Sequence, residues 1–483
     1  MTATWASLSP ELLLYVLQSL SSPKDLYSAI TASSRLYRVY KCYKHPITLA
    51  ILEQAIPLEI EADFVLAYKA QHIWNFVVEP TDDVRLYDRK SRIWNSQDRL
   101  MQESLAILEL SQSGHGKQMR ELSSDRKVLL NLWNLYKKFE YLMLLYIPRA
   151  LSALKVPSIQ QGSRIPRPRP LSTIEQNRLK RAFFRFEYYT CLFQISQAKH
   201  CDSYDDVPLS HPALKYLQSL SCCEVEALSC IGQFYVMLVE ELCDKIEDDF
   251  VSAVKQKTET FLPRTASSKP RDLAVCLDYV CLHWYDPSFK SVDRKRHVQY
   301  LVSRGVFGIF RLINLPLDTV KKMIVRTHIT SQRQTLIMDS MESLHRSQEA
   351  HDHERKGCEC DCHTFGWQIA RNTMGHIWTS NAPCNYDLRN QGYVFWNKLR
   401  LKHLEQFKHP RARVTSSCQY PVGYEAHSHV DRLRDGLGST PIYQSVINEI
   451  ADEICPEFEQ EALTDDTDHE DDIRTPFVIH WRD

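Results

Sequence analysis

The chain has 483 residues, of which 43% are hydrophobic, and a formal net charge of -1. A chain of this length can bury a large core and is expected to form two or three domains. Its near-zero net charge excludes a global electrostatic attraction to nucleic acid or to an anionic membrane. Only 13 residues are glycine, which disfavours turn-rich sheet folds and glycine-lined phosphate loops, so we predict a mainly α protein.

The first forty residues contain two capped helix starts. Ser9 is a predicted N-cap, Pro10 occupies the first helical position, and Glu11 favours the positive end of the helix dipole. Ser22 and Asp25 form a predicted capping box for a second helix. A third short helix is expected from Ser34. The apolar face of these helices is larger than so short a segment can bury by itself.

These helices carry a recognisable order of residues. Leu8, Pro10, Glu11 and Leu12 open the pattern, Val16, Leu17 and Leu20 continue it, Asp25 and Leu26 form an Asp-Leu pair, and Ser34, Arg35, Leu36 and Tyr37 close it. The pattern resembles an F-box, with Ser9 where family members usually carry proline and Tyr37 in place of a frequent tryptophan. The resemblance implies a three-helix F-box-like module in which these thirteen residues bind the Skp-type adaptor of a cullin-RING ubiquitin ligase complex.

The same resemblance implies a non-catalytic substrate receptor whose helical body binds a protein substrate that the sequence does not identify. We find no internal repeat with a period of 20 to 50 residues, so the body is expected to be an irregular multi-helical region. An alternative is a stand-alone helical interaction or scaffold protein. In that case the N-terminal hairpin belongs to the protein's own core.

Composition shifts divide the chain into seven predicted regions. They are the F-box-like module (1–45), a helical region (46–155), a Pro/Arg linker (156–171), a helical domain (172–345), a polar Cys/His-rich loop (346–365), a second helical region (366–448) and an acidic tail (449–483). The segment from 172 and the segment from Gly392 also resemble stretches of large fungal proteins that begin with F-box-like modules. The tail includes the run DDTDHEDD at 465–472, whose charges repel one another and oppose compaction.

Two long helices are predicted in the body. The first runs from Asp125 to Ile147, and Pro148 is expected to end or kink it. The second follows the linker, is capped by Ser172 or Thr173, and has one apolar side. That side comprises Leu179, Phe183, Phe186, Tyr189 and Phe193. A base-stacking role for these aromatic residues is disfavoured relative to core packing, so no nucleic-acid partner is expected.

The fifteen cysteines do not form a recognisable disulfide pattern, because their number is odd and their spacing irregular. Cys222, Cys223, Cys230 and Cys243 lie in an apolar helical segment and are expected to be buried and reduced. The densest cluster of possible metal ligands contains Cys358, Cys360, Cys362 and His363. Alternate residues of an extended strand lie about 6.6 Å apart, too far for one zinc ion unless the loop folds sharply. We therefore predict a solvated loop without metal, with a zinc or copper site as the alternative.

The chain lacks the common catalytic signatures. His427, His429 and Asp431 match an H-x-H-x-D opening of binuclear metallohydrolases, but Arg432 stands where that motif continues with histidine. We expect neither an enzyme nor a cofactor. No apolar run approaches the about 18 residues needed to span a bilayer, and no secretion signal is evident. The expected location is therefore the cytoplasm or the nucleus, without a membrane partner.

Overall fold

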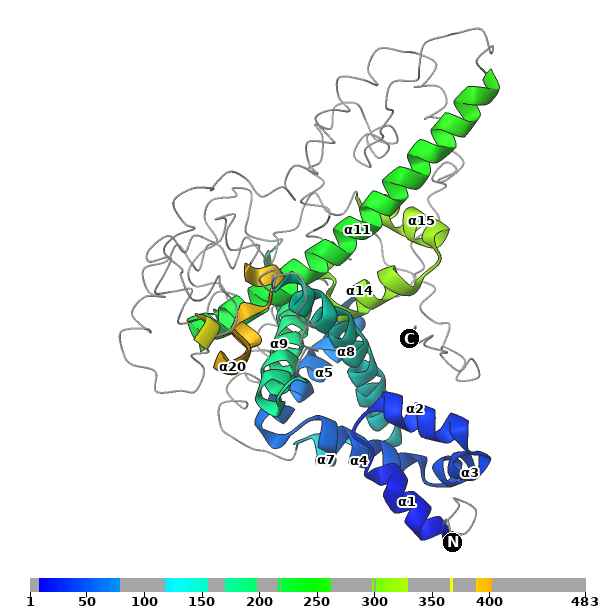
Figure 1. Ribbon diagram of the computed structural model, residues 1–483, viewed down its shortest axis with the longest axis vertical. Helices are drawn as coiled ribbons and strands as arrows, with labels where there is room; N and C mark the ends of the chain where they lie inside the picture. Colours follow the sequence, from blue (N-terminus) through cyan, green and yellow to red (C-terminus); the bar gives the residue numbers. More distant parts are fainter. Residues whose placement is uncertain are drawn as a thin grey trace, which may run out of the picture.

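A computed structural model describes residues 8–78, 118–154, 170–197, 216–217, 219–261, 298, 301–328, 365–367 and 388–401. These residues are mainly helical and include no strand, as predicted from the composition. A run of short N-terminal helices is followed by a multi-helical body (Figure 1).

The three short helices expected at the N-terminus are α1 (Pro10–Gln18), α2 (Pro23–Ala32) and α3 (Ser34–Cys42). Serine side chains cap all three. The Ser9 hydroxyl accepts the Leu12 N–H of α1 at 3.5 Å, and the Ser22 hydroxyl accepts the Asp25 N–H of α2 at 3.1 Å. Ser33 caps α3 in the same way. Such a cap typically contributes about 1 kcal/mol, which matters for helices that have few turns.

The next helix, α4 (Lys44–Ala55), joins the short helices to the body. It contacts α1 and α3 on one side and α8 (Arg126–Ala153) on the other. The side chain of Gln54 donates to the carbonyl of Gln18 at 2.7 Å, which fixes the end of α1 against α4. The ring of His45 lies 3.0 Å from the carbonyl oxygen of Ser123, just after α7 (Gln118–Leu122). The module is therefore packed onto the body through α4.

The helices α5 (Leu58–Val78) and α9 (Thr173–Gln197) lie along each other. The Arg181 guanidinium donates to the carbonyl of Glu59 at 2.7 Å, and the Gln71 amide donates to the Glu187 carboxylate at 2.6 Å, so the partner numbers rise together. The two helices are therefore parallel. The predicted start of α9 is confirmed, because Ser172 and Glu175 form a capping box at its first turn.

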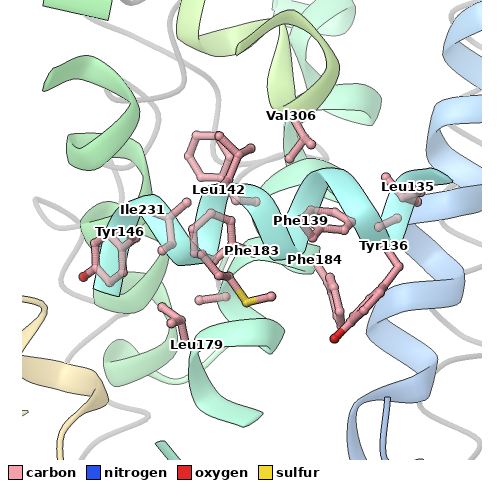
Figure 2. Close-up of a cluster of buried hydrophobic side chains, with 14 of the residues drawn as sticks. Leu135, Tyr136, Phe139, Leu142, Tyr146, Leu179, Phe183, Phe184, Ile231 and Val306 are labelled. Carbon is pink, nitrogen blue, oxygen red and sulfur yellow. The ribbon is translucent and has the colours of Figure 1, made fainter. Parts of the chain in front are cut away.

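The core is centred on α8, whose predicted apolar side is buried (Figure 2). Aromatic rings of α8 and α9 meet edge to face, with the Phe139 and Phe184 centroids 4.8 Å apart. Pro148 lies inside α8, which continues to Ala153 and is thus not ended by the proline. The cluster drawn in Figure 2 includes Leu135, Tyr136, Phe139, Leu142, Tyr146, Leu179, Phe183, Phe184, Ile231 and Val306.

The longest helix, α11 (Cys222–Phe261), has 40 residues and packs against α9. It also contacts α14 (Gly305–Asn314), which is followed by α15 (Leu317–His328). The short helices η4 (Tyr393–Phe395) and α20 (Lys398–Leu401) lie near the beginning of α11. In Figure 1, the Phe261 end of α11 and the helices α1 to α3 lie at opposite ends of the described structure.

Several sequence predictions fall on residues outside this description. They concern the linker up to residue 169, the Cys/His-rich loop up to residue 364, the segment 402–448 and the acidic tail. On α11, Cys223, Cys230 and Cys243 are buried and carry free thiols, as expected from their apolar surroundings. Among the described helices, none combines the length and the apolar character needed to cross a membrane.

Candidate protein-docking surface

The helix α1 has apolar side chains on two of its faces. Leu13 and Leu17, four residues apart, are both 0% exposed and point into the protein. Leu12 and Tyr15, three residues apart, are 51% and 68% exposed. Residues at these spacings share a helix face, so α1 packs with one apolar face and presents another to solvent.

The same division continues in α2 and α3. Leu26 and Leu36 are buried, whereas Tyr27, Tyr37 and Tyr43 are exposed. Within the described part of the chain, half of the exposed large apolar side chains come from residues 12–43. We define the docking surface as Leu12, Tyr15, Tyr27, Tyr37 and Tyr43. Single exposed apolar residues are common, but these five are concentrated in one short segment of the chain, and we treat them together as the candidate interaction site.

The thirteen residues predicted to bind the adaptor differ in exposure. Pro10, Glu11, Leu12, Asp25, Ser34 and Tyr37 are exposed, Leu8, Val16, Leu20 and Arg35 are half-buried, and Leu17, Leu26 and Leu36 are buried. The three buried leucines hold α1, α2 and α3 together in the free protein. A partner can reach Leu12 and Tyr37 without any rearrangement of these helices.

Two of the predicted residues have defined local contacts. The Arg35 guanidinium donates to the main-chain carbonyl of Leu8 and so connects α3 to the beginning of α1. Asp25 accepts the hydroxyl hydrogens of Ser21 and Ser22 at 3.1 and 2.8 Å, which completes the capping box of α2. Both side chains therefore stabilise the shape of the module, and only their remaining surface is open to a partner.

Charged groups lie on both sides of the module. At the beginning of α1, the hydrogen bond from the Ser9 side chain lowers the pKa of the exposed Glu11 carboxyl. At the junction with the body, burial raises the pKa of Glu140 on α8 to about 7, although Lys180 on α9 opposes the shift. Lys180 also donates to the carbonyl of Ala55, the last residue of α4, at 2.5 Å. This junction is polar and partly desolvated.

Sequence reasoning missed three members of the docking surface, namely Tyr15, Tyr27 and Tyr43. The predicted pattern used Leu12, Val16, Leu17 and Leu20 in this segment and left out Tyr15. The spacing of Leu8, Leu12 and Tyr15, at steps of four and three, is a second helical stripe in the same segment. That stripe is the signal that could have identified Tyr15.

The described residues contain no group of three or more His, Cys, Asp or Glu side chains arranged to hold a metal ion. The candidate ligands Cys358, Cys360, Cys362 and His363 lie outside the described residues. Comparisons with family models, curated proteins and solved structures find no match to this chain.

Proposed function

We propose that the protein is a non-catalytic substrate receptor of a cullin-RING ubiquitin ligase. In this proposal the docking surface binds the Skp-type adaptor, and the helical body selects a protein substrate. The receptor supplies proximity between the substrate and the ligase, whose other subunits carry the chemistry. The F-box-like order of residues from Leu8 to Tyr37 motivates the identity of the partner.

The observation that carries the proposal is the two-faced packing of α1. A terminal helix that only completed the core would expose polar residues on its outer side. Here Leu12 and Tyr15 are exposed although Leu13 and Leu17 already anchor the helix. Exposed apolar side chains on a firmly anchored helix favour a preformed contact with a second protein.

The test is co-purification of the full chain with a Skp-type adaptor. The variant carries Leu12→Asp and Tyr15→Asp, which place two charges on the docking surface without touching the buried face. We expect adaptor recovery to fall at least tenfold, because an interface that desolvates unpaired carboxylates loses affinity. Circular dichroism and the thermal midpoint should stay close to those of the unchanged protein.

A matched control places the same charges elsewhere. Leu58 at the start of α5 and Leu399 in α20 are 72% and 64% exposed, so Leu58→Asp with Leu399→Asp adds two carboxylates outside the module. The control should retain the adaptor. The proposed contact would be contradicted if both double variants retained the adaptor equally well, or if both lost it.

The alternative of a stand-alone interaction or scaffold protein is favoured by a specific observation. Leu17, Leu26 and Leu36 are buried within the chain's own structure, and α4 packs the module onto α8. On this alternative the folded, unchanged protein retains no Skp-type adaptor. The co-purification experiment therefore separates the two functions before any variant is compared.

A further inference from the structure

Two serine-proline pairs stand at the beginnings of α1 and α2. Ser9 precedes Pro10, and Ser22 precedes Pro23; both serines are N-caps with extended backbone conformations. Proline immediately after serine is the feature that proline-directed protein kinases require. The two pairs are therefore alike in sequence, and the structure distinguishes them.

Accessibility differs between the pairs. Ser9 and Pro10 are both exposed, whereas Ser22 is half-buried and Pro23 is buried. A kinase must surround the acceptor residue and the following proline, which at Ser22 would require the start of α2 to unfold. Of the two serines, Ser9 is therefore the one that a kinase can reach in the folded protein.

The hydroxyl groups are also held differently. The Ser9 oxygen lies 3.5 Å from the Leu12 nitrogen, at the limit of a hydrogen bond. The Ser22 hydroxyl accepts the Asp25 N–H at 3.1 Å and donates to the Asp25 carboxylate at 2.8 Å. Phosphorylation of Ser22 would remove that donor and place two anionic groups together in a half-buried site, so Asp25 opposes the modification there. The Ser9 side chain also bonds a carboxylate, that of Glu11, but both groups are exposed and the solvent screens their repulsion.

We propose that Ser9 is a phosphorylation site for a proline-directed serine kinase and that Ser22 is not. In the reaction the Ser9 oxygen attacks the γ-phosphorus of magnesium-bound ATP, an O–P bond forms, ADP leaves and the hydroxyl proton is released. The product carries about -1.5 to -2 charges at neutral pH.

The surroundings of Ser9 connect the modification to the docking surface. Arg35 is held against the Leu8 carbonyl, one residue before Ser9, and supplies a cation near the new phosphate. Leu12 lies one turn after Ser9 on α1. On the basis of the proposed function, a phosphate here would place a strongly hydrated anion at the edge of the adaptor contact and weaken it.

The site is tested on the full chain with a purified proline-directed kinase, MgATP and phosphopeptide mapping. We expect phosphate on Ser9 at an occupancy at least tenfold above that on Ser22, and loss of the Ser9 signal in Ser9→Asn. Asparagine is a good N-cap, so this control keeps the start of α1 intact. Absence of phosphate on Ser9, or equal labelling of both serines, would overturn the assignment.

The consequence is tested with Ser9→Asp and Ser9→Asn, which cap helices about equally well and differ in charge. The Asp variant should bind the Skp-type adaptor at least threefold more weakly than the Asn variant. Equal binding would overturn the proposed weakening. If the unchanged chain bound no adaptor, the proposed function would fail, whereas the phosphopeptide map would still decide the modification site.

Discussion

At the scale of single residues, Leu12 and Leu17 illustrate how one helix separates two roles. Both are leucines on the nine-residue helix α1, but Leu12 is 51% exposed and Leu17 is 0% exposed. Leu17→Ala should lower the free energy of unfolding by about 2–5 kcal/mol, because it leaves a cavity in the core. Leu12→Ala should change it by less than about 1 kcal/mol.

This pair is checked by urea unfolding of the two alanine variants, followed by fluorescence. Similar midpoints for Leu12→Ala and Leu17→Ala would show that α1 is not anchored in the way described. The adaptor assay gives the complementary result, because only Leu12 is accessible in the folded protein. A substitution at Leu17 that reduced adaptor binding would do so by unfolding the module.

Glu140 gives a prediction for pH dependence. Burial raises its pKa in the folded protein to about 7, against opposition from Lys180 and Lys24, while Asp25 adds to the shift. Ionisation therefore costs more in the folded state than in the unfolded state, whose carboxyl titrates near pH 4.3. The associated stability is present below about pH 4.3 and is lost as the pH rises through about 7.

Glu140→Gln removes this titration. We expect the thermal midpoint of the unchanged protein to fall more between pH 5 and pH 8 than that of Glu140→Gln. Glu121→Gln, at an exposed position on α7, is the matched control and should follow the unchanged protein. Parallel midpoints for Glu140→Gln and Glu121→Gln across this range would contradict the assignment.

At the scale of helices, α14 depends on a carboxylate from another element. The buried Glu187 on α9 accepts the Val306 N–H at 2.5 Å and the Gln71 amide at 2.6 Å. Gly305 has a φ of 70°, and a β-carbon there would lie 2.5 Å from the Glu187 carboxylate. Glycine is thus required for α14 to approach α9 this closely.

Glu187→Ala should loosen α14, because Val306 and Gln71 would lose their acceptor in a buried site. Leaving such groups unsatisfied costs about 1–3 kcal/mol each. Hydrogen exchange across residues 305–314 should become faster, while exchange in α1 stays unchanged. Unchanged exchange in α14 would show that the carboxylate does not stabilise this helix.

Local sequence signals predicted the helices well and their partners poorly. The caps Ser9, Ser22 and Ser172 and the apolar side of α8 depend on neighbours within a few residues, and each is found as predicted. The packing of α4 between the short helices and α8, and the hydrogen bond from Val306 of α14 to Glu187, depend on residues distant in sequence. Such pairings leave no periodic signal in a single chain, which is why they could not be predicted.

At the scale of the whole molecule, residues far apart in sequence are joined by a buried ion pair. The Arg389 guanidinium donates two hydrogen bonds to the Glu226 carboxylate on α11, at 2.8 and 2.9 Å. The side chains are 2% and 0% exposed. The pair connects the segment that contains η4 and α20 to the first turns of α11.

Arg389→Met should destabilise the protein by about 3–5 kcal/mol, because Glu226 remains buried without its counter-charge. The double variant Arg389→Met, Glu226→Met should recover most of this loss, since both buried charges are removed together. Chemical unfolding of both single variants and the double variant measures the coupling. Additive losses would show that the two side chains act independently.

The uninterrupted length of α11 sets a lower limit on the longest dimension of the protein. At 1.5 Å per residue, its 40 residues span about 60 Å. Figure 1 places the far end of this rod away from α1, α2 and α3. Two proteins bound at these two ends would lie far apart. A direct contact between them would therefore require a flexible segment in one of the two bound proteins.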